Sequence, residues 1–263
     1  WNADVRSLAL LHPDLDGEFV SSGQAHGSAT RPQVAGEVRA RRLRYAGLGV
    51  ESLEADLDVD ATDARESRVD LRAAKIDLGL IALDSAHFEA HGRSSEHALA
   101  LEFSAQGDEA RRLPGFRGRL GATGTYAAAR TTWLARLEEA TVTFPDGGAT
   151  LLQPAAIEMS PALVRVAPDC LQSAEARLCA EGEQHANPAS WRVIYSAQDW
   201  PLRRLLRTLL GWREFDGRLQ AAGWAQQEAG HDWTGGMTVL LDEPTLDIPR
   251  NKFRTERLEL GKG

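Results

Sequence analysis

The sequence has few of the features by which the most easily recognised protein classes are identified. Of its 263 residues, only two are cysteines and only 6% are aromatic. The 30 basic residues are outnumbered by 38 acidic ones, which gives a formal net charge of −8. Such a chain lacks the basic face that meets nucleic-acid phosphates, so no nucleic-acid partner is expected. The longest apolar runs span about four residues, far short of the roughly 20 that cross a bilayer as a helix.

The chain also carries no segment with the pattern of a secretory signal peptide. It begins with Trp1 and ends with Gly263, and we interpret it as a fragment of a longer protein. On this interpretation a missing targeting signal says nothing about location. Any contact with a membrane is then expected through parts of the protein outside the fragment.

The overall composition is that of a folded chain. Hydrophobic residues make up 43% and charged residues of both signs 26%, which is not typical of disordered proteins. The length allows one large β domain or two ordinary domains, each with a sizeable core.

The dominant pattern is an alternation of apolar and polar residues that recurs along the chain. In residues 97–104 the odd positions hold His97, Leu99, Leu101 and Phe103. Because successive side chains of a strand point to opposite faces, each such segment predicts a strand with one apolar and one polar face. His97 is expected to be half-buried, with its polar atoms hydrogen-bonded. Similar alternation occurs in segments 53–60, 69–72, 75–80, 142–144, 157–159, 164–166, 191–195 and 237–241.

Turn signals separate these segments at intervals of about 8 to 12 residues. Strands joined by such short connections are mostly antiparallel. The sequence therefore predicts an all-β protein made of similar antiparallel hairpins in one continuous segment, residues 1–263. Residues 1–40, rich in Gly, Ser, Pro and charge, are predicted to form irregular or edge strands.

One segment, residues 199–211, has helical rather than strand periodicity. Its leucines are spaced i, i+3, i+4 and i+7, with Pro201 in the first turn and Gly211 at the stop. The prediction is a short amphipathic helix that needs a docking surface to be stable. The leucines of this helix are Leu202, Leu205, Leu206 and Leu209.

The two cysteines, Cys170 and Cys179, lie nine positions apart. They are interpreted either as two buried thiols or, in preference, as a disulfide across a hairpin whose turn contains Gln172 and Ser173. A zinc site is disfavoured because His185 is the only further ligand type nearby. A disulfide would indicate an oxidising compartment such as the periplasm or the cell exterior.

No arrangement of residues predicts catalysis. On a strand, His87 and His91 would lie about 13 Å apart, too far to share a metal ion. Asp56, Asp58 and Asp60 line one strand face, and a solvated charged face is favoured there over a catalytic or calcium-binding site. No nucleotide-binding, serine-hydrolase or metalloprotease motif is present. We therefore expect a protein that is not an enzyme and needs no metal or cofactor.

An ordered set of residues nevertheless resembles a known family. The resemblance begins with the pattern Leu43-x-Tyr45-x-x-Leu48-x-Val50-x-x-Leu53 and continues with Gly92 before His97-x-Leu99-x-Leu101. The remaining marks are, in order, Trp133, Leu151, Pro154-Ala155, Ile157, Val164-x-Val166, Cys170-Leu171, Leu178-Cys179, Gly182, Trp191, the leucine-rich segment 201–210 and Gly217-Arg218-Leu219. This set resembles the middle of the TamB family, the translocation and assembly module subunit of Gram-negative envelopes, which belongs with the AsmA-like, bridge-like lipid transport proteins.

The resemblance implies a periplasmic segment of a protein that is anchored in the inner membrane. It implies a long, curved antiparallel sheet folded into an apolar trough, called a β-taco, and an Omp85-type outer-membrane barrel as partner. It also implies transfer of phospholipid between the two membranes, or assembly of outer-membrane proteins. A one-sided apolar sheet agrees with this, since its apolar face must be covered or must meet something apolar.

Three hypotheses follow. The first is a non-catalytic conduit for phospholipid, in which acyl chains lie on the inward face of the trough. The predicted helix over residues 199–211 would enter this trough as a plug or an end cap. The second is a scaffold or chaperone module that pairs its sheet edge with nascent outer-membrane barrels. The third, suggested only by the tryptophans of the last third and by paired acids, is a secreted carbohydrate-active enzyme or carbohydrate-binding module. The inward face of the first hypothesis is predicted to contain Leu53, Leu57, Val59, Ile76, Leu78, Leu99, Leu101, Phe103, Val193, Val239 and Leu241.

Overall fold

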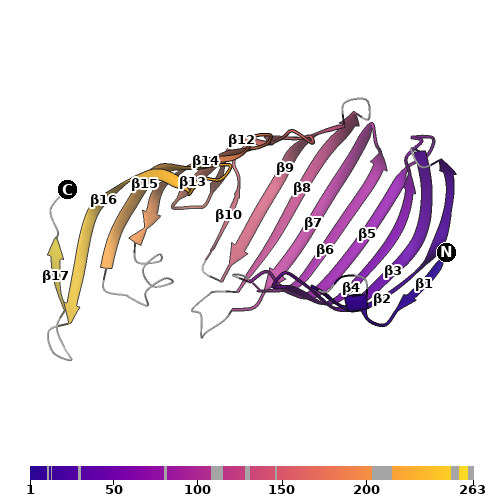
Figure 1. Ribbon diagram of the computed structural model, residues 1–263. Coiled ribbons are helices and arrows are strands. Elements are labelled where there is room, and N and C mark those ends of the chain that lie inside the picture. Colours follow the sequence, from indigo (N-terminus) through magenta and orange to yellow (C-terminus); the bar gives the residue numbers. More distant parts are fainter. Residues whose placement is uncertain are drawn as a thin grey trace. The chain divides into compact units, whose positions relative to one another are not determined.

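The computed structural model of the chain consists almost entirely of antiparallel β-strands (Figure 1). It describes residues 1–259 apart from 11, 13, 29–30, 80–81, 108–114, 128–130, 146, 203–214 and 250–254. For residues 215, 243–249 and 255–259 only the backbone is described. The predicted all-β, antiparallel fold class is confirmed.

The chain divides into two compact units, which are described separately. Unit 1 comprises Trp1–Gln106 and Gly115–Thr143. Its strands follow one another across the sheet in chain order, each antiparallel to the next (Figure 1). A short 3₁₀ helix, Leu8–Leu10, connects the first two. The strands are β1 (Asn2–Val5), β2 (Leu15–Ser28), β3 (Arg31–Tyr45), β4 (Leu48–Asp60), β5 (Ser67–Asp77), β6 (Ala82–Arg93), β7 (Glu96–Ala105), β8 (Phe116–Ala127) and β9 (Thr132–Phe144).

Unit 2 comprises Gly107–Pro114 and Phe144–Gly263. From β11 to β17 each strand is again antiparallel to the next, and β10 pairs with β12. The strands are β10 (Gly147–Leu151), β11 (Ala155–Met159), β12 (Leu163–Gln172), β13 (Arg177–Ala186), β14 (Ala189–Pro201), β15 (Phe215–Glu228), β16 (Thr234–Pro249) and β17 (Thr255–Glu259).

Short turns account for the simple strand order. Between β3 and β4 only Ala46 and Gly47 remain unpaired, and both have positive φ, 49° and 85°. Two such residues are the signature of a type I′ turn, whose twist matches that of the flanking strands. A connection this short leads β3 and β4 to pair with each other.

The N-terminal 40 residues, expected to be irregular or edge strands, contain β1, the 3₁₀ helix, β2 and the first part of β3. Trp1 packs on this part of the sheet. Its indole N–H donates to Ser21 Oγ at 3.0 Å, and its ring covers the glycines Gly23 and Gly36.

The predicted helix over residues 199–211 does not begin at residue 199, because residues 199–201 are the last residues of β14. Residues 203–211 lie outside the described residues. Its first leucine, Leu202, directly follows β14 and is buried, with 5% of its surface exposed. Leu205, Leu206 and Leu209 lie outside the described part of the chain. Among the residues that the structure describes, no helix is long and apolar enough to cross a membrane.

Successive turns at one end of unit 1 are tied together by carboxylates. Asp60, 2% exposed, accepts hydrogen bonds from the amide and hydroxyl of Thr62 at 2.8 and 2.5 Å. Asp63 reaches the β6–β7 turn, where Ser94 N–H and Oγ–H donate to its Oδ1 at 2.6 and 2.8 Å. The carbonyl of Ser94 in turn accepts from Tyr126 N–H at 2.7 Å. These bonds connect three consecutive hairpins and so oppose shear between them.

The hydrogen bonds also change the acidity of the carboxyls. The side chains of Ser95 and Ser94, followed by their backbone amides, hold the pKa of Asp63 below its ordinary value of 3.8. Hydrogen bonding from Thr62 lowers the pKa of Asp60 in the same way. A carboxyl whose pKa is lower in the folded state stabilises the fold above its unfolded-state pKa, and this stabilisation is lost as the pH falls through the folded-state pKa.

The first prediction concerns this turn network. Asp63→Ala should lower the melting temperature of the protein by a few degrees at pH 7, because Ser94 and Ser95 lose their acceptor. The difference from wild type should shrink as the pH falls below about 3.8, because the carboxyl of Asp63 then gains a proton in the unfolded chain before it does so in the folded protein. Circular dichroism melts between pH 7 and pH 3 measure both effects. Asp56→Ala, an exposed position on β4, is the matched control, and an equal loss in the control would contradict the assignment.

Candidate functional site

One face of unit 1 is apolar across β4 to β9, and we call it the apolar face of unit 1. The strand register aligns its side chains in rows that run across the strands. The first row is Leu53, Ala73, Ala86, Phe103, Gly118 and Val142; the second is Ala55, Leu71, Phe88, Leu101, Leu120 and Ala140; the third is Leu57, Val69, Ala90, Leu99, Ala122 and Leu137. A fourth row holds Ser67, Gly92, His97, Gly124 and Ala135, with Val59 following Leu57 in the same phase.

Six of the residues predicted from sequence to share an inward face lie on this surface. Three come from β4 and three from β7, namely Leu53, Leu57, Val59, Leu99, Leu101 and Phe103. Alternation within a strand predicts which residues of that strand share a face. The register adds that the apolar sides of neighbouring strands coincide.

The residues of these four rows are shielded although the described strands of unit 1 form a single sheet. Each is buried or half-buried. The small residues lie deepest, as shown by Ala55 at 7% and Ala140 at 5% exposure. The larger neighbours therefore cover the alanines, and the rows form a continuous apolar surface with the aliphatic and aromatic side chains outermost.

The opposite side, which we call the charged face of unit 1, carries ion pairs within and between strands. On β5, Arg72 Nη2 lies 2.9 Å from the buried Asp70 Oδ2. On β8, Arg119 lies between Glu102 of β7 at 3.9 Å and Glu139 of β9 at 3.6 Å. Exposed pairs such as those of Arg119 add little stability individually. Their consequence is that this face is wet, and the hollow of about 690 Å³ that opens on it is bordered by Arg72, Glu102 and Arg119.

Among the residues that the structure describes, the charged face contains one group of potential metal ligands. His87 Nε2 lies 3.2 Å from Asp70 Oδ1 and 3.5 Å from Glu89 Oε1, and the donor atoms of the three residues fall within 4.8 Å of one another. Arg72 and Arg68 lie 2.9 and 4.0 Å from Asp70 Oδ2, so two arginines oppose the two carboxylates of the cluster. We assign it as an ion-pair network.

Glycines on the apolar face lie beneath aromatic rings, a feature that the sequence reading did not anticipate. A Cβ added at Gly118 would lie 2.1 Å from Phe103 Cζ. At Gly124 an added Cβ would lie 2.8 Å from both His97 Nε2 and Trp133 Nε1. The sequence held one indication of this arrangement. Gly118 and Gly124 are even-numbered like Leu120 and Ala122, which places them on the apolar side of the same strand.

His97 and Trp133 form a polar contact within this apolar surface. The indole N–H of Trp133 donates to His97 Nε2 at 2.6 Å, and the ring planes lie within 14° of each other with centroids 6.2 Å apart. His97 Nδ1 lies 3.2 Å from the carbonyl of Arg93. The histidine is half-buried with both ring nitrogens hydrogen-bonded, as the sequence indicated.

Unit 2 has an apolar face of its own. Val193, Val239 and Leu241 occupy one face of β14–β16 by register, together with Leu178 on β13. This surface is more open than that of unit 1, with Val239 43% and Leu241 44% exposed. Tyr195 covers Gly223 here in the same manner as Phe103 covers Gly118.

The two remaining predicted inward residues, Ile76 and Leu78, are placed differently. Ile76 pairs with Val50 and Leu83, outside the four rows. Lys75, with φ of 52°, interrupts the strand between Ala73 and Ile76, so the alternation of residues 69–73 does not extend to Ile76. Leu78 lies beyond the end of β5 and is 48% exposed.

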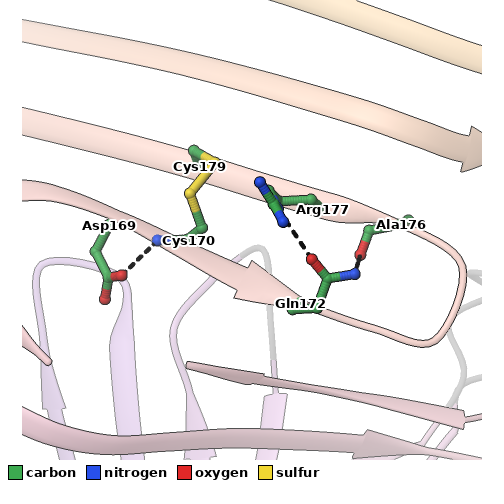
Figure 2. Close-up of a disulfide and its surroundings, with 6 residues drawn as sticks. All are labelled: Asp169, Cys170, Gln172, Ala176, Arg177 and Cys179. Carbon is green, nitrogen blue, oxygen red and sulfur yellow. Dashed lines mark hydrogen bonds between the residues drawn. A yellow bond between two sulfur atoms is a disulfide. The ribbon is translucent and has the colours of Figure 1, made fainter. Parts of the chain in front are cut away.

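The predicted disulfide between Cys170 and Cys179 is present (Figure 2). The cysteines are directly opposite each other on β12 and β13, with Cα atoms 4.0 Å apart. Cys179 has the opposite parity to Leu178, so the disulfide lies on the side away from the apolar face of unit 2. The adjoining turn is closed by Ala176 N–H, which donates to Ser173 Oγ at 2.8 Å. Beside it, Arg177 Nε–H donates to Gln172 Oε1 at 2.9 Å (Figure 2).

The second prediction concerns this disulfide. Replacing both cysteines, Cys170→Ala with Cys179→Ala, should lower the unfolding free energy by about 2.5 kcal/mol, because the short closed loop no longer restricts the unfolded chain. Denaturant unfolding with and without reductant measures the loss. Reductant should destabilise the wild type by a similar amount and leave the double variant unchanged, and a reductant effect in the double variant would contradict the account.

Comparison with known proteins gives one family match. Residues 1–261 match the family model described as "TamB, N-terminal domain". The resemblance drawn from the sequence pointed to the same family, although to its middle. No solved structure matches the chain.

Proposed function

Since the chain belongs to the TamB family, we propose that it is a periplasmic segment of a non-catalytic envelope protein that conducts phospholipid between the inner and outer membranes. In this function the apolar faces of the two units contact the acyl chains. The observation that carries the proposal is the coincidence of the apolar rows over β4 to β9, opposite a charged face.

A continuous apolar surface of this kind suits an elongated apolar ligand. Each methylene that an acyl chain transfers from water to an apolar surface contributes about 0.8 kcal/mol. The rows run across the strands and present aliphatic side chains from β4 to β9, so a chain lying along a row keeps apolar contact as it moves.

The charged face serves a different purpose in this proposal. Its ion pairs keep that side of the sheet in water, and the phosphate headgroups remain solvated at the border of the apolar face. No proton transfer or bond cleavage is needed, because moving a lipid along the surface changes only its contacts.

Family membership supports a role in transport or assembly at the cell envelope. We propose that the full-length protein is anchored in the inner membrane and meets an Omp85-type barrel in the outer membrane through regions outside this chain. Phospholipid acyl chains are the proposed partners of the segment itself. The disulfide is consistent with an oxidising compartment.

The third prediction tests the assignment of the two faces with neighbouring positions of β7. A photoreactive p-benzoyl-phenylalanine placed at Leu101 in the full-length protein should capture phospholipid in cells, because this side chain is on the apolar face. The same group at Glu102, on the charged face, should capture little. Mass spectrometry of the photoproducts identifies the lipid.

Equal capture of phospholipid at positions 101 and 102 would contradict the conduit proposal. Capture of outer-membrane barrel proteins in place of lipid would instead favour the alternative in which the sheet pairs with nascent barrels. Thermal unfolding of both variants verifies that the inserted group leaves the fold intact.

A further inference from the structure

We infer that two glycines of β8, Gly118 and Gly124, keep the apolar face of unit 1 clear by letting aromatic side chains of the neighbouring strands lie flat along the sheet. This inference rests on the proposed lipid path and identifies residues that set its clearance. It assigns to these glycines a function in transport beyond their conformational role in the strand.

The arrangement at Gly118 is the clearest. Phe103 lies beside Gly118 in the register of β7 and β8. A Cβ built on Gly118 would lie 2.1, 2.5 and 2.7 Å from Phe103 Cζ, Cε2 and Cε1. The far end of the ring therefore occupies the place of the missing side chain, so the ring reaches sideways over β8 and does not stand upright. Phe116, which is on β8 like Gly118, makes an edge-to-face contact with the ring of Phe103 at 6.1 Å between centroids.

Gly124 has the same relation to a pair of rings. Both His97 and Trp133 approach the position of its missing Cβ to 2.8 Å. The hydrogen bond from Trp133 to His97 thus passes directly over β8, from β9 to β7. Any side chain at position 124 would separate the two rings or raise them from the sheet.

Conformational need does not explain these glycines. Positive φ values occur at glycines such as Gly17, Gly92 and Gly217, whereas Gly118 and Gly124 do not have them. In the interior of a strand, glycine is less favourable than alanine by roughly 0.5–1 kcal/mol. The atoms that an added Cβ would meet at both positions are side-chain atoms of aromatic residues. What glycine provides at these positions is therefore space for the rings.

The consequence for the proposed path follows from the rows. Phe103 and Gly118 share a row with Leu53, Ala73 and Ala86. A ring lying flat is part of the floor of this row, whereas a raised ring would stand across it. Alanine at position 118 would force the ring of Phe103 upward, since a Cβ at 2.1 Å from Cζ is not tolerated.

The fourth prediction uses capture of phospholipid at Leu101 as its readout. The full-length protein with the photoreactive group at Leu101 is mixed with phosphatidylethanolamine vesicles that carry a radiolabelled acyl chain. Gly118→Ala should reduce labelling severalfold. Combining it with Phe103→Ala should restore labelling to near the wild-type level, because the obstructing ring is then absent.

Gly121→Ala is the matched control. Gly121 is on the same strand but faces the charged side, where an added Cβ meets Glu139 Cβ at an ordinary 3.5 Å. Labelling should be unchanged in this variant. Thermal unfolding of every variant separates lost labelling from lost folding. If Gly118→Ala alone is destabilised, the double variant with Phe103→Ala still tests whether the ring causes the loss of labelling.

The outcomes separate the inference from the function on which it rests. Wild-type protein that captures no phospholipid at Leu101 overturns both. Wild-type capture with undiminished labelling in Gly118→Ala overturns only the role of the glycine. A double variant labelled no better than Gly118→Ala does the same, because the loss would then not pass through the ring of Phe103.

Discussion

The structure depends on one constraint. The apolar side chains of every strand must face the same side of the sheet as those of the neighbouring strands. In a single-layer antiparallel sheet, a register slip of one residue would move a whole strand's apolar side chains to the other face. The rows of unit 1 show that this does not happen from β4 to β9. Both the charged face and the apolar face are consequences of that agreement, as is any function that uses them.

β-bulges maintain the phase where the sequence departs from strict alternation. On β9, Leu137 and Ala140 are three positions apart and so differ in parity, yet both belong to apolar rows. The register shift between Gly121 and Ala122 of β8 absorbs the extra residue. A comparable shift between Val166 and Asp169 does the same on β12 in unit 2. These irregularities therefore preserve the two-sided character of the sheets.

The sequence predicted those features that are encoded locally. Alternation within β4 and β7 correctly predicted strands with one apolar side, and the nine-residue spacing of the cysteines correctly predicted a hairpin disulfide. The face on which Ile76 lies could not be predicted in this way. Lys75 has a left-handed backbone conformation, which interrupts the alternation before Ile76. The contact of Phe103 with Gly118 and the clamp from Asp63 to Ser94 join residues that are distant in sequence. Such contacts depend on register, which a single strand does not encode.

The most direct test of the central claim is a spin-label scan along β7, one label at a time from residue 97 to residue 104, in the full-length protein with phospholipid. Electron paramagnetic resonance measures the accessibility of each label to oxygen, which dissolves in acyl chains, and to a water-soluble nickel complex. The account predicts an oscillation with a period of two residues, in which labels at the odd positions favour oxygen and labels at the even positions favour nickel. A flat profile, or an oscillation with the even positions facing lipid, would contradict it.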